Sequence, residues 1–131
     1  MNGVKRSASW VDKEILKFPP QNGTPVKSVV LDGEDSGWGL TFDNATTRAY
    51  VPAGTILKVS ATNTDKHVKY NGTGTIDGIL TRPIDLVAQA SKASSAAPMY
   101  FFDVIFATES IVGFTNYASA LVNDLKSCMF Q

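Results

Sequence analysis

Short β-prone segments separated by turn residues dominate the chain after residue 25. In the stretch 55–62, Leu57, Val59 and Ala61 alternate with polar side chains, which is the period of two of a half-buried strand. We therefore expect these three side chains to point into a core. Similar runs bounded by turn residues predict strands at 26–31, 40–42, 67–70, 76–80 and 84–87.

Three other segments complete the β region. Asn71-Gly72 follows a predicted strand directly and indicates a hairpin turn. Residues 88–97 are rich in Ala and Ser, and they predict a loop or a weak helix. Residues 99–107, MYFFDVIFA, are apolar on both faces apart from Asp103. This pattern predicts a central strand, or a strand pressed against another chain.

The carboxy-terminal segment predicts a helix. Thr115 or Asn116 can cap its first turn. The fold class we expect is mainly β (α+β): a small β-barrel or sandwich-like domain over residues 26–131 that ends in this helix. The predicted apolar face of the helix consists of Ala118, Leu121, Val122, Leu125 and Met129, which recur at helical spacing.

Residues 1–25 predict a flexible, extended amino-terminal arm outside the core. Pro19-Pro20 would stop any helical turn that precedes it, because proline lacks the backbone donor and restricts the residue before it. Large apolar side chains in such a segment need a place to be buried, either on their own domain or on a partner. The side chains concerned are Trp10, Val11, Ile15, Leu16 and Phe18.

The overall charge balance favours neither nucleic acid nor membrane as a partner. Formal net charge is +0, although residues 1–30 carry five basic against two acidic residues. No window approaches the roughly 18 apolar residues of a membrane span, and the start at Met1 lacks the pattern of a signal peptide. Cys128 is the only cysteine, so we expect no intrachain disulfide and a small core or interface side chain there.

Candidate chemistry is sparse in the sequence. His67 is the only histidine, so a Ser-His-Asp or Cys-His arrangement could form only around it, and its polar surroundings predict a surface position. Asp32, Glu34 and Asp35 lack the spacing of a calcium loop and predict a solvated turn. The flanks of Asp65-Lys66 differ from those of a lipoyl- or biotinyl-lysine turn. We therefore expect no catalytic residue, metal site or cofactor.

The order of four motifs is more informative than any single residue. YVPAGTILKVSATN is followed by KHVKYNGTG, then by TIDGILTRPIDLVA and MYFFDVIFA. This order resembles the lambda-type head-decoration (capsid-stabilising) proteins of tailed bacteriophages. The resemblance covers about residues 50–107, and it depends on the order and spacing of short motifs. The matching residues are Ala53, Gly54, Thr55, Ile56, Leu57, Tyr70, Gly78, Ile79, Leu80 and Asp85.

The resemblance implies a non-enzymatic virion protein. Such a protein would form a homotrimer on the outer surface of an expanded capsid, at local threefold positions, after assembly in the host cytoplasm. Its arm would bind the major capsid protein by adding a strand to a sheet edge. The implied capsid-binding residues are Lys5, Arg6, Trp10, Val11, Lys13, Ile15, Leu16, Lys17 and Phe18. The implied subunit contact, from the strand 99–107 or the helix face, comprises Tyr100, Phe102, Val104, Phe106 and Phe130.

Two other functions remain open from the sequence. One is a small β-rich binding module of a phage tail or baseplate, or of a carbohydrate-binding type. Exposure of Trp38, Tyr50 and Tyr70 on one face would favour that function. The other is an enzyme or carrier domain in which Lys66 or His67 has the functional role.

Overall fold

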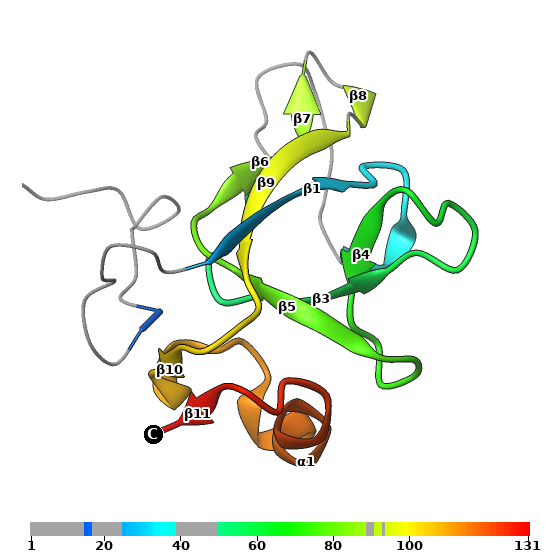
Figure 1. Cartoon of the computed structure of the whole chain (residues 1–131). Coiled ribbons are helices and arrows are strands. Elements are labelled where there is room, and N and C mark those ends of the chain that lie inside the picture. The colour runs from blue at the N-terminus through cyan, green and yellow to red at the C-terminus, as the bar shows by residue number, and fades with distance from the viewer. Residues whose placement is uncertain (1–14, 17–24, 39–49, 89–90, 93) are drawn as a thin grey trace, which may run out of the picture.

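The computed structural model describes residues 15–16, 25–38, 50–88, 91–92 and 94–131. In these residues the fold is mainly β, with a closed barrel of five strands and a carboxy-terminal helix, as the sequence predicts (Figure 1). The barrel strands, in the order in which they pair, are β1 (Val26–Leu31), β4 (His67–Lys69), β3 (Ile56–Val59), β5 (Ile76–Leu80) and β9 (Ser95–Tyr100).

The first strand closes the barrel. β1 pairs antiparallel with β9 along its full length, from Val26 opposite Tyr100 to Leu31 opposite Ser95. Its last residue, Leu31, also pairs in parallel with His67 of β4. β3 lies between β4 and β5, and β5 pairs in turn with β9. Each of the five strands therefore has a hydrogen-bonded neighbour on both sides.

Smaller elements surround the barrel (Figure 1). Two-stranded sheets are formed by β2 with β6, by β7 with β8, and by β10 with β11. Their bounds are β2 (Tyr50–Val51), β6 (Ile84–Asp85), β7 (Val87–Ala88), β8 (Ser91–Lys92), β10 (Ile105–Phe106) and β11 (Met129–Phe130). The helical elements are the 3-10 turns η1 (Ser36–Trp38) and η2 (Thr108–Ser110) and the α-helix α1 (Phe114–Asp124).

Two hydrophobic cores share the barrel strands. One contains Leu31, Leu57, Leu80 and Met99, each fully buried on the inward side of its strand. The other lies against the outer side of β3 and β5. There Ile56, Ile76 and Ile79 meet α1 and the segment around β10. From these carboxy-terminal segments, Phe106, Leu121 and Leu125 complete the second core.

The position of β3 between these cores corrects one sequence prediction. Ile56 and Leu57 are both buried, because each faces a different core. Pairing with β5 then shifts register between Leu57 and Lys58, and β3 ends at Val59. Val59 is 42% exposed and Ala61 is exposed, so the prediction that these two point inward was wrong.

The expected hairpin at Asn71-Gly72 is also wrong. The predicted strands on either side form as β4 and β5, but both pair with β3 and not with each other. The loop 71–75 therefore passes the end of β3. Lys58 of β3 holds this loop, because its Nζ donates to Asn71 Oδ1 and to the Thr73 carbonyl, each at 3.0 Å.

The region 84–107 divides differently from the prediction. The predicted strand 84–87 splits into β6 and β7, and the expected loop or weak helix 88–97 contains β8 and the start of β9. The stretch 99–107 is not one strand, because β9 ends at Tyr100 and the chain turns at Asp103, whose φ is 55°. Its residues look apolar on both faces because Met99 enters the barrel core and Phe106 enters the other. The predicted strand 40–42 lies outside the described residues.

The carboxy-terminal helix is confirmed, with a different cap and face. Gly113, at φ 80°, precedes α1, while Thr115 and Asn116 are exposed within its first turn. Leu121 and Leu125 are buried as predicted, and Ala118 is half-buried. Val122 is exposed, and Met129 belongs to β11 because the helix ends at Asp124.

A substitution at Gly78 tests the packing between barrel strands. A Cβ at this position would lie 2.6 Å from both Met99 Sδ and the Tyr100 carbonyl oxygen. Since the carbonyl belongs to a paired strand, we expect Gly78→Ala to lower the free energy of unfolding by about 1–3 kcal/mol. Urea unfolding measures the change. Gly37→Ala is the control, because its Cβ would meet only the flexible Asp35 side chain, and equal losses for the two variants would contradict the packing.

Candidate functional site

The amino-terminal segment is attached to the domain at Ile15 and Leu16. The Ala107 N–H donates to the Ile15 carbonyl at 2.8 Å, and Leu16 forms an antiparallel bridge with Phe106. The segment thus lines one side of β10 while β11 pairs with the other (Figure 1). Both side chains are buried in the core that α1 covers. At these two positions the apolar side chains pack on their own domain.

The other implied capsid-binding residues have no described position. Of the implied residues, the structure describes Ile15 and Leu16, which are buried in the domain's own core. An arm that begins before Ile15 therefore starts from a fixed point beside β10. The implied residues that lie outside the described ones are Lys5, Arg6, Trp10, Val11, Lys13, Lys17 and Phe18.

The implied subunit-contact residues are divided between core and surface. Val104 and Phe106 are buried in the core beneath α1. Phe130 stacks on Phe106 with ring centroids 5.4 Å apart, and Tyr100 meets the Phe106 ring edge-on at 6.4 Å. Phe102 is 49% exposed at the bend after β9. Phe102 is thus the member of this set with the most freely accessible apolar surface.

Two exposed apolar surfaces were missed from the sequence. The first is the outer β1/β9 face, where Val26 is 52% and Val30 is 37% exposed. The second is a shallow hollow on α1, which we call the α1 hollow, lined by Ala118, Ser119, Val122 and Asn123. The alternation within VKSVVL is the signal for the first surface, because it places Val26 and Val30 on one side of β1. By register, the outer β1/β9 face comprises Val26, Ser28, Val30, Ala96, Pro98 and Tyr100.

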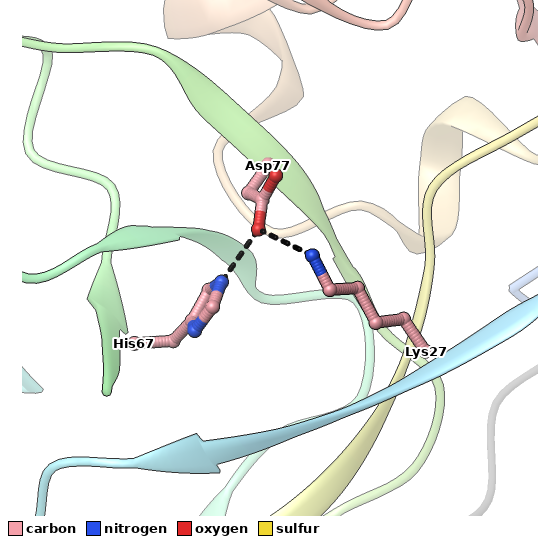
Figure 2. Close-up of polar contacts among 3 residues, drawn as sticks. All are labelled: Lys27, His67 and Asp77. Carbon is pink, nitrogen blue, oxygen red and sulfur yellow. Dashed lines mark hydrogen bonds and ion pairs between the residues drawn. The ribbon is translucent and has the colours of Figure 1, made fainter. Parts of the chain in front are cut away.

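A polar cluster joins three barrel strands (Figure 2). Nε2 of His67, on β4, lies 2.6 Å from Oδ2 of Asp77, on β5. Nζ of Lys27, on β1, lies 3.8 Å from the same oxygen. The predicted surface position of His67 was wrong, because the residue is only 7% exposed. Its strand position opposite Leu31, at the closure of the barrel, was not visible in the sequence.

Because a carboxylate can only accept, Nε2 of His67 donates its proton to the hydrogen bond with Asp77. Nδ1 is buried and has no hydrogen-bond partner in the described part of the chain. The two ring nitrogens are therefore not hydrogen-bonded to any serine, threonine or cysteine that the structure describes. What the arrangement provides is a shared carboxylate that links β4, β5 and β1.

The acidic turn also has a structural role that the sequence did not reveal. Asp32 is buried, and its carboxylate accepts from the Glu34 N–H at 3.1 Å and from Asn63 Nδ2 at 3.3 Å. Its carbonyl accepts from the indole of Trp38 at 2.7 Å. The prediction of a solvated turn therefore fails for Asp32, although Glu34 is exposed. Among the described residues, no three His, Cys, Asp or Glu side chains are grouped to hold a metal ion.

The remaining candidates take ordinary positions. Lys66 Nζ lies 3.2 Å from Ser94 Oγ at the surface, and Cys128 is buried in the core beneath α1. Trp38 and Tyr70 are buried, and Tyr50 is half-buried. Trp38 and Tyr70 therefore do not form an exposed aromatic platform together with Tyr50.

No protein-family model matches the chain, and no curated protein matches it either. In the residues that the structure describes, no helix combines the length and the apolar character needed to cross a membrane.

The attachment of the amino-terminal segment predicts a stability effect. Leu16→Ala removes most of a buried side chain beside Phe106, and we expect the free energy of unfolding to fall by about 2–4 kcal/mol. Chemical denaturation measures the loss. Val122→Ala is the control, because Val122 is 57% exposed and should change stability by less than about 0.5 kcal/mol. A Leu16→Ala value as small as the control would show that the segment is not attached.

The polar cluster predicts a second, independent effect. Asp77→Ala leaves the buried Nε2 of His67 without its acceptor, which should cost about 1–3 kcal/mol of stability. Lys27→Ala should cost less than about 1 kcal/mol, because this ion pair is half exposed and long. Asp77→Asn, which keeps an acceptor oxygen, should fall between them. Equal losses for Asp77→Ala and Lys27→Ala in thermal unfolding would contradict this ranking.

Proposed function

We propose that the chain is a non-enzymatic capsid decoration protein that binds the outer surface of an expanded phage head as a trimer and stabilises its lattice. The major capsid protein is the partner. The observation that carries the proposal is that the motifs of the resemblance, distant in sequence, are joined by backbone hydrogen bonds. Gly54 N–H donates to Leu80 at 2.9 Å, Leu80 N–H to Thr55 at 2.9 Å, and Tyr70 N–H to Ile56 at 2.8 Å.

These motif residues form the scaffold of the domain. Thr55, Leu57, Ile79 and Leu80 are almost completely buried, and Gly54 takes a φ of 89° that favours glycine. Buried residues in this arrangement stabilise the barrel, and their side chains are not available to a partner. The proposal therefore requires that binding be carried out by surfaces outside the motifs.

The amino-terminal segment is the surface best placed for this binding. Its attachment at Ile15 and Leu16 leaves residues 1–14 ahead of a fixed point beside β10. Fully extended, 14 residues reach at most about 45 Å. The barrel is closed, and in this proposal the arm adds a strand to a sheet edge of the capsid protein. Trp10 and Val11 then remain as apolar anchors, and Lys5, Arg6 and Lys13 suit an acidic capsid surface.

Attachment of a trimer would be strengthened by its three arms. Once one arm is bound, the other two act at a high effective concentration, so modest affinity per arm gives tight attachment. Ordering each arm costs a few kcal/mol of the gross interaction. A protein that binds the assembled lattice but not its dissociated subunits stabilises the lattice by linkage. The decoration protein thus acts as a clamp.

The alternatives receive less support from the described residues. Exposure of Trp38, Tyr50 and Tyr70 on one face would favour a carbohydrate-binding or tail-associated module. Trp38 and Tyr70 are buried, so this support is missing. For an enzyme, His67 would need a reacting group beside its second ring nitrogen, and Nδ1 is buried without a hydrogen-bond partner in the described part of the chain.

Co-sedimentation with heads tests the proposal. The probe is expanded, undecorated heads of tailed bacteriophages, assembled from their major capsid proteins. We expect the full-length chain to sediment with these heads, and a chain lacking residues 1–14 but retaining Ile15 and Leu16 to remain in solution. Lys66→Ala is the control, because this surface side chain contacts Ser94 and should not affect binding.

Each failure has a distinct meaning. Equal binding with and without residues 1–14 would refute the role of the arm. If the full-length chain does not bind the heads, the decoration proposal itself is wrong.

A further inference from the structure

The side-chain carbonyl of Asn71, at the start of the loop 71–75, accepts three hydrogen bonds. Lys58 Nζ donates to Asn71 Oδ1 at 3.0 Å, the Thr73 N–H at 3.1 Å and the Thr73 hydroxyl at 2.8 Å. Donors within about 3.1 Å of an oxygen are suited to stabilise negative charge that develops there during a reaction. The three donors therefore make the carbonyl carbon, Cγ, more open to attack by a nucleophile.

The main-chain amide of Gly72 is placed to be that nucleophile. The bond from the Thr73 N–H to Asn71 Oδ1 closes a ring that contains the Gly72 peptide group, so the Asn71 side chain is folded over it. In the described part of the chain, the Gly72 N–H has no hydrogen-bond acceptor. Gly72 is exposed, takes a φ of 98° and lacks a side chain, so base from solvent can reach its N–H.

The leaving group and the incoming water are also unobstructed. Asn71 is exposed, and its Nδ2 donates to no group that the structure describes. Asn71 and Lys58 line a polar surface hollow together with Asp35, Ser60 and Thr62. Nδ2 can therefore depart into solvent, and water can reach the carbon that it leaves.

We propose that Asn71 is a site of spontaneous deamidation in the folded chain, promoted by Lys58 and Thr73. Gly72 N gives its proton to base and attacks Cγ. A C–N bond forms, the Cγ–Nδ2 bond breaks, and Nδ2 leaves as ammonia with a proton from water. The product is a five-membered succinimide. Water then adds at Cγ to give aspartate, or at the main-chain carbonyl carbon to give isoaspartate.

Lys58 acts here as a donor and does not itself attack Cγ. Its Nζ donates both to Asn71 Oδ1 and to the Thr73 carbonyl, each at 3.0 Å. An ammonium group has three donors and no lone pair. Attack by Lys58 would give a side-chain amide between Lys58 and Asn71, and this product is distinguishable from those of deamidation.

Both products would change the loop between β4 and β5. Aspartate adds a negative charge that faces Lys58, where a neutral amide now stands. Isoaspartate adds one atom to the main chain directly after Tyr70, which packs edge-on against Tyr117 at 5.0 Å. The inference does not depend on the proposed function, since it involves no partner.

Peptide mapping of aged protein tests the site. The folded chain is kept for weeks in mildly alkaline buffer, digested and analysed by mass spectrometry. We expect a gain of one mass unit at residue 71, as aspartate and isoaspartate that co-elute with synthetic standards. Asn22-Gly23, the same dipeptide outside the described residues, is an internal reference. Conversion at Asn22 while Asn71 stays intact would overturn the inference.

Lysine variants test the role of the hydrogen bond. Loss of one such donor in a water-free enzyme site slows a reaction about 10²–10³-fold, and at this exposed site we expect Lys58→Met to slow conversion of Asn71 about three- to tenfold. Lys69→Met is the matched control, because Lys69 lines the same hollow but does not contact Asn71 Oδ1. Neither variant should alter the rate at Asn22, and circular dichroism checks that both are folded.

The same variants in concentrated urea separate structure from sequence. There the three donors are no longer assembled, so Lys58→Met and the unmodified chain should convert Asn71 at equal rates. An unchanged or faster rate in folded Lys58→Met overturns the inference, as does equal slowing by Lys69→Met. A stable branched peptide that joins Lys58 to Asn71 would show that lysine is the nucleophile, and it would overturn the inference as well.

Discussion

Closure of the barrel through β1 is the constraint on which the other features depend. β1 pairs along its full length with β9 and at Leu31 with His67 of β4. This closure gives every barrel strand a neighbour on each side, although β1 meets β4 only at its last residue. At the same closure His67 is buried, and the Asp77 carboxylate accepts a hydrogen bond from its Nε2. The position of β1 directly after the amino-terminal segment links barrel closure to the start of the arm.

A barrel this small has to divide its apolar residues among several surfaces. Leu57 and Met99 fill the interior, whereas Ile56 and Ile79 face outward beneath α1. The outward side chains of β1 have no such cover in the described residues. Ile15 and Leu16 extend the covered region by lying along β10. In the proposed clamp, the covered regions hold the domain together, and the uncovered ones are left for other chains.

The sequence predicted the positions of strands and the helix better than it predicted which side chains are buried and what they contact. The strands 26–31 and 76–80 and the final helix follow from local periodicity, which depends on neighbouring residues alone. The inward direction of Val59 failed because β3 lies between two cores, and that arrangement depends on strands distant in sequence. His67 was misplaced for the same reason, since Asp77 and Leu31 come from other strands.

The candidate binding surfaces also depend on contacts between distant parts of the sequence, so local patterns did not predict them. A run of apolar residues at 99–107 predicted a subunit contact, yet Val104 and Phe106 fill the chain's own core after the turn at Asp103. The sequence could not indicate that turn, because the residues around it remain apolar. The outer β1/β9 face was present in the alternation of 26–31. The sequence alone does not show that α1 packs on the neighbouring strands while Val26 and Val30 of β1 stay exposed.

The proposed clamp would stabilise an assembled head, and the heat resistance of heads tests this function most directly. Scanning calorimetry of expanded heads, with and without saturating full-length chain, measures the temperature at which the lattice comes apart. Because linkage favours the state that is bound, we expect this temperature to rise clearly and to level off once every binding position is filled. Heads that bind the chain yet come apart at an unchanged temperature would contradict it.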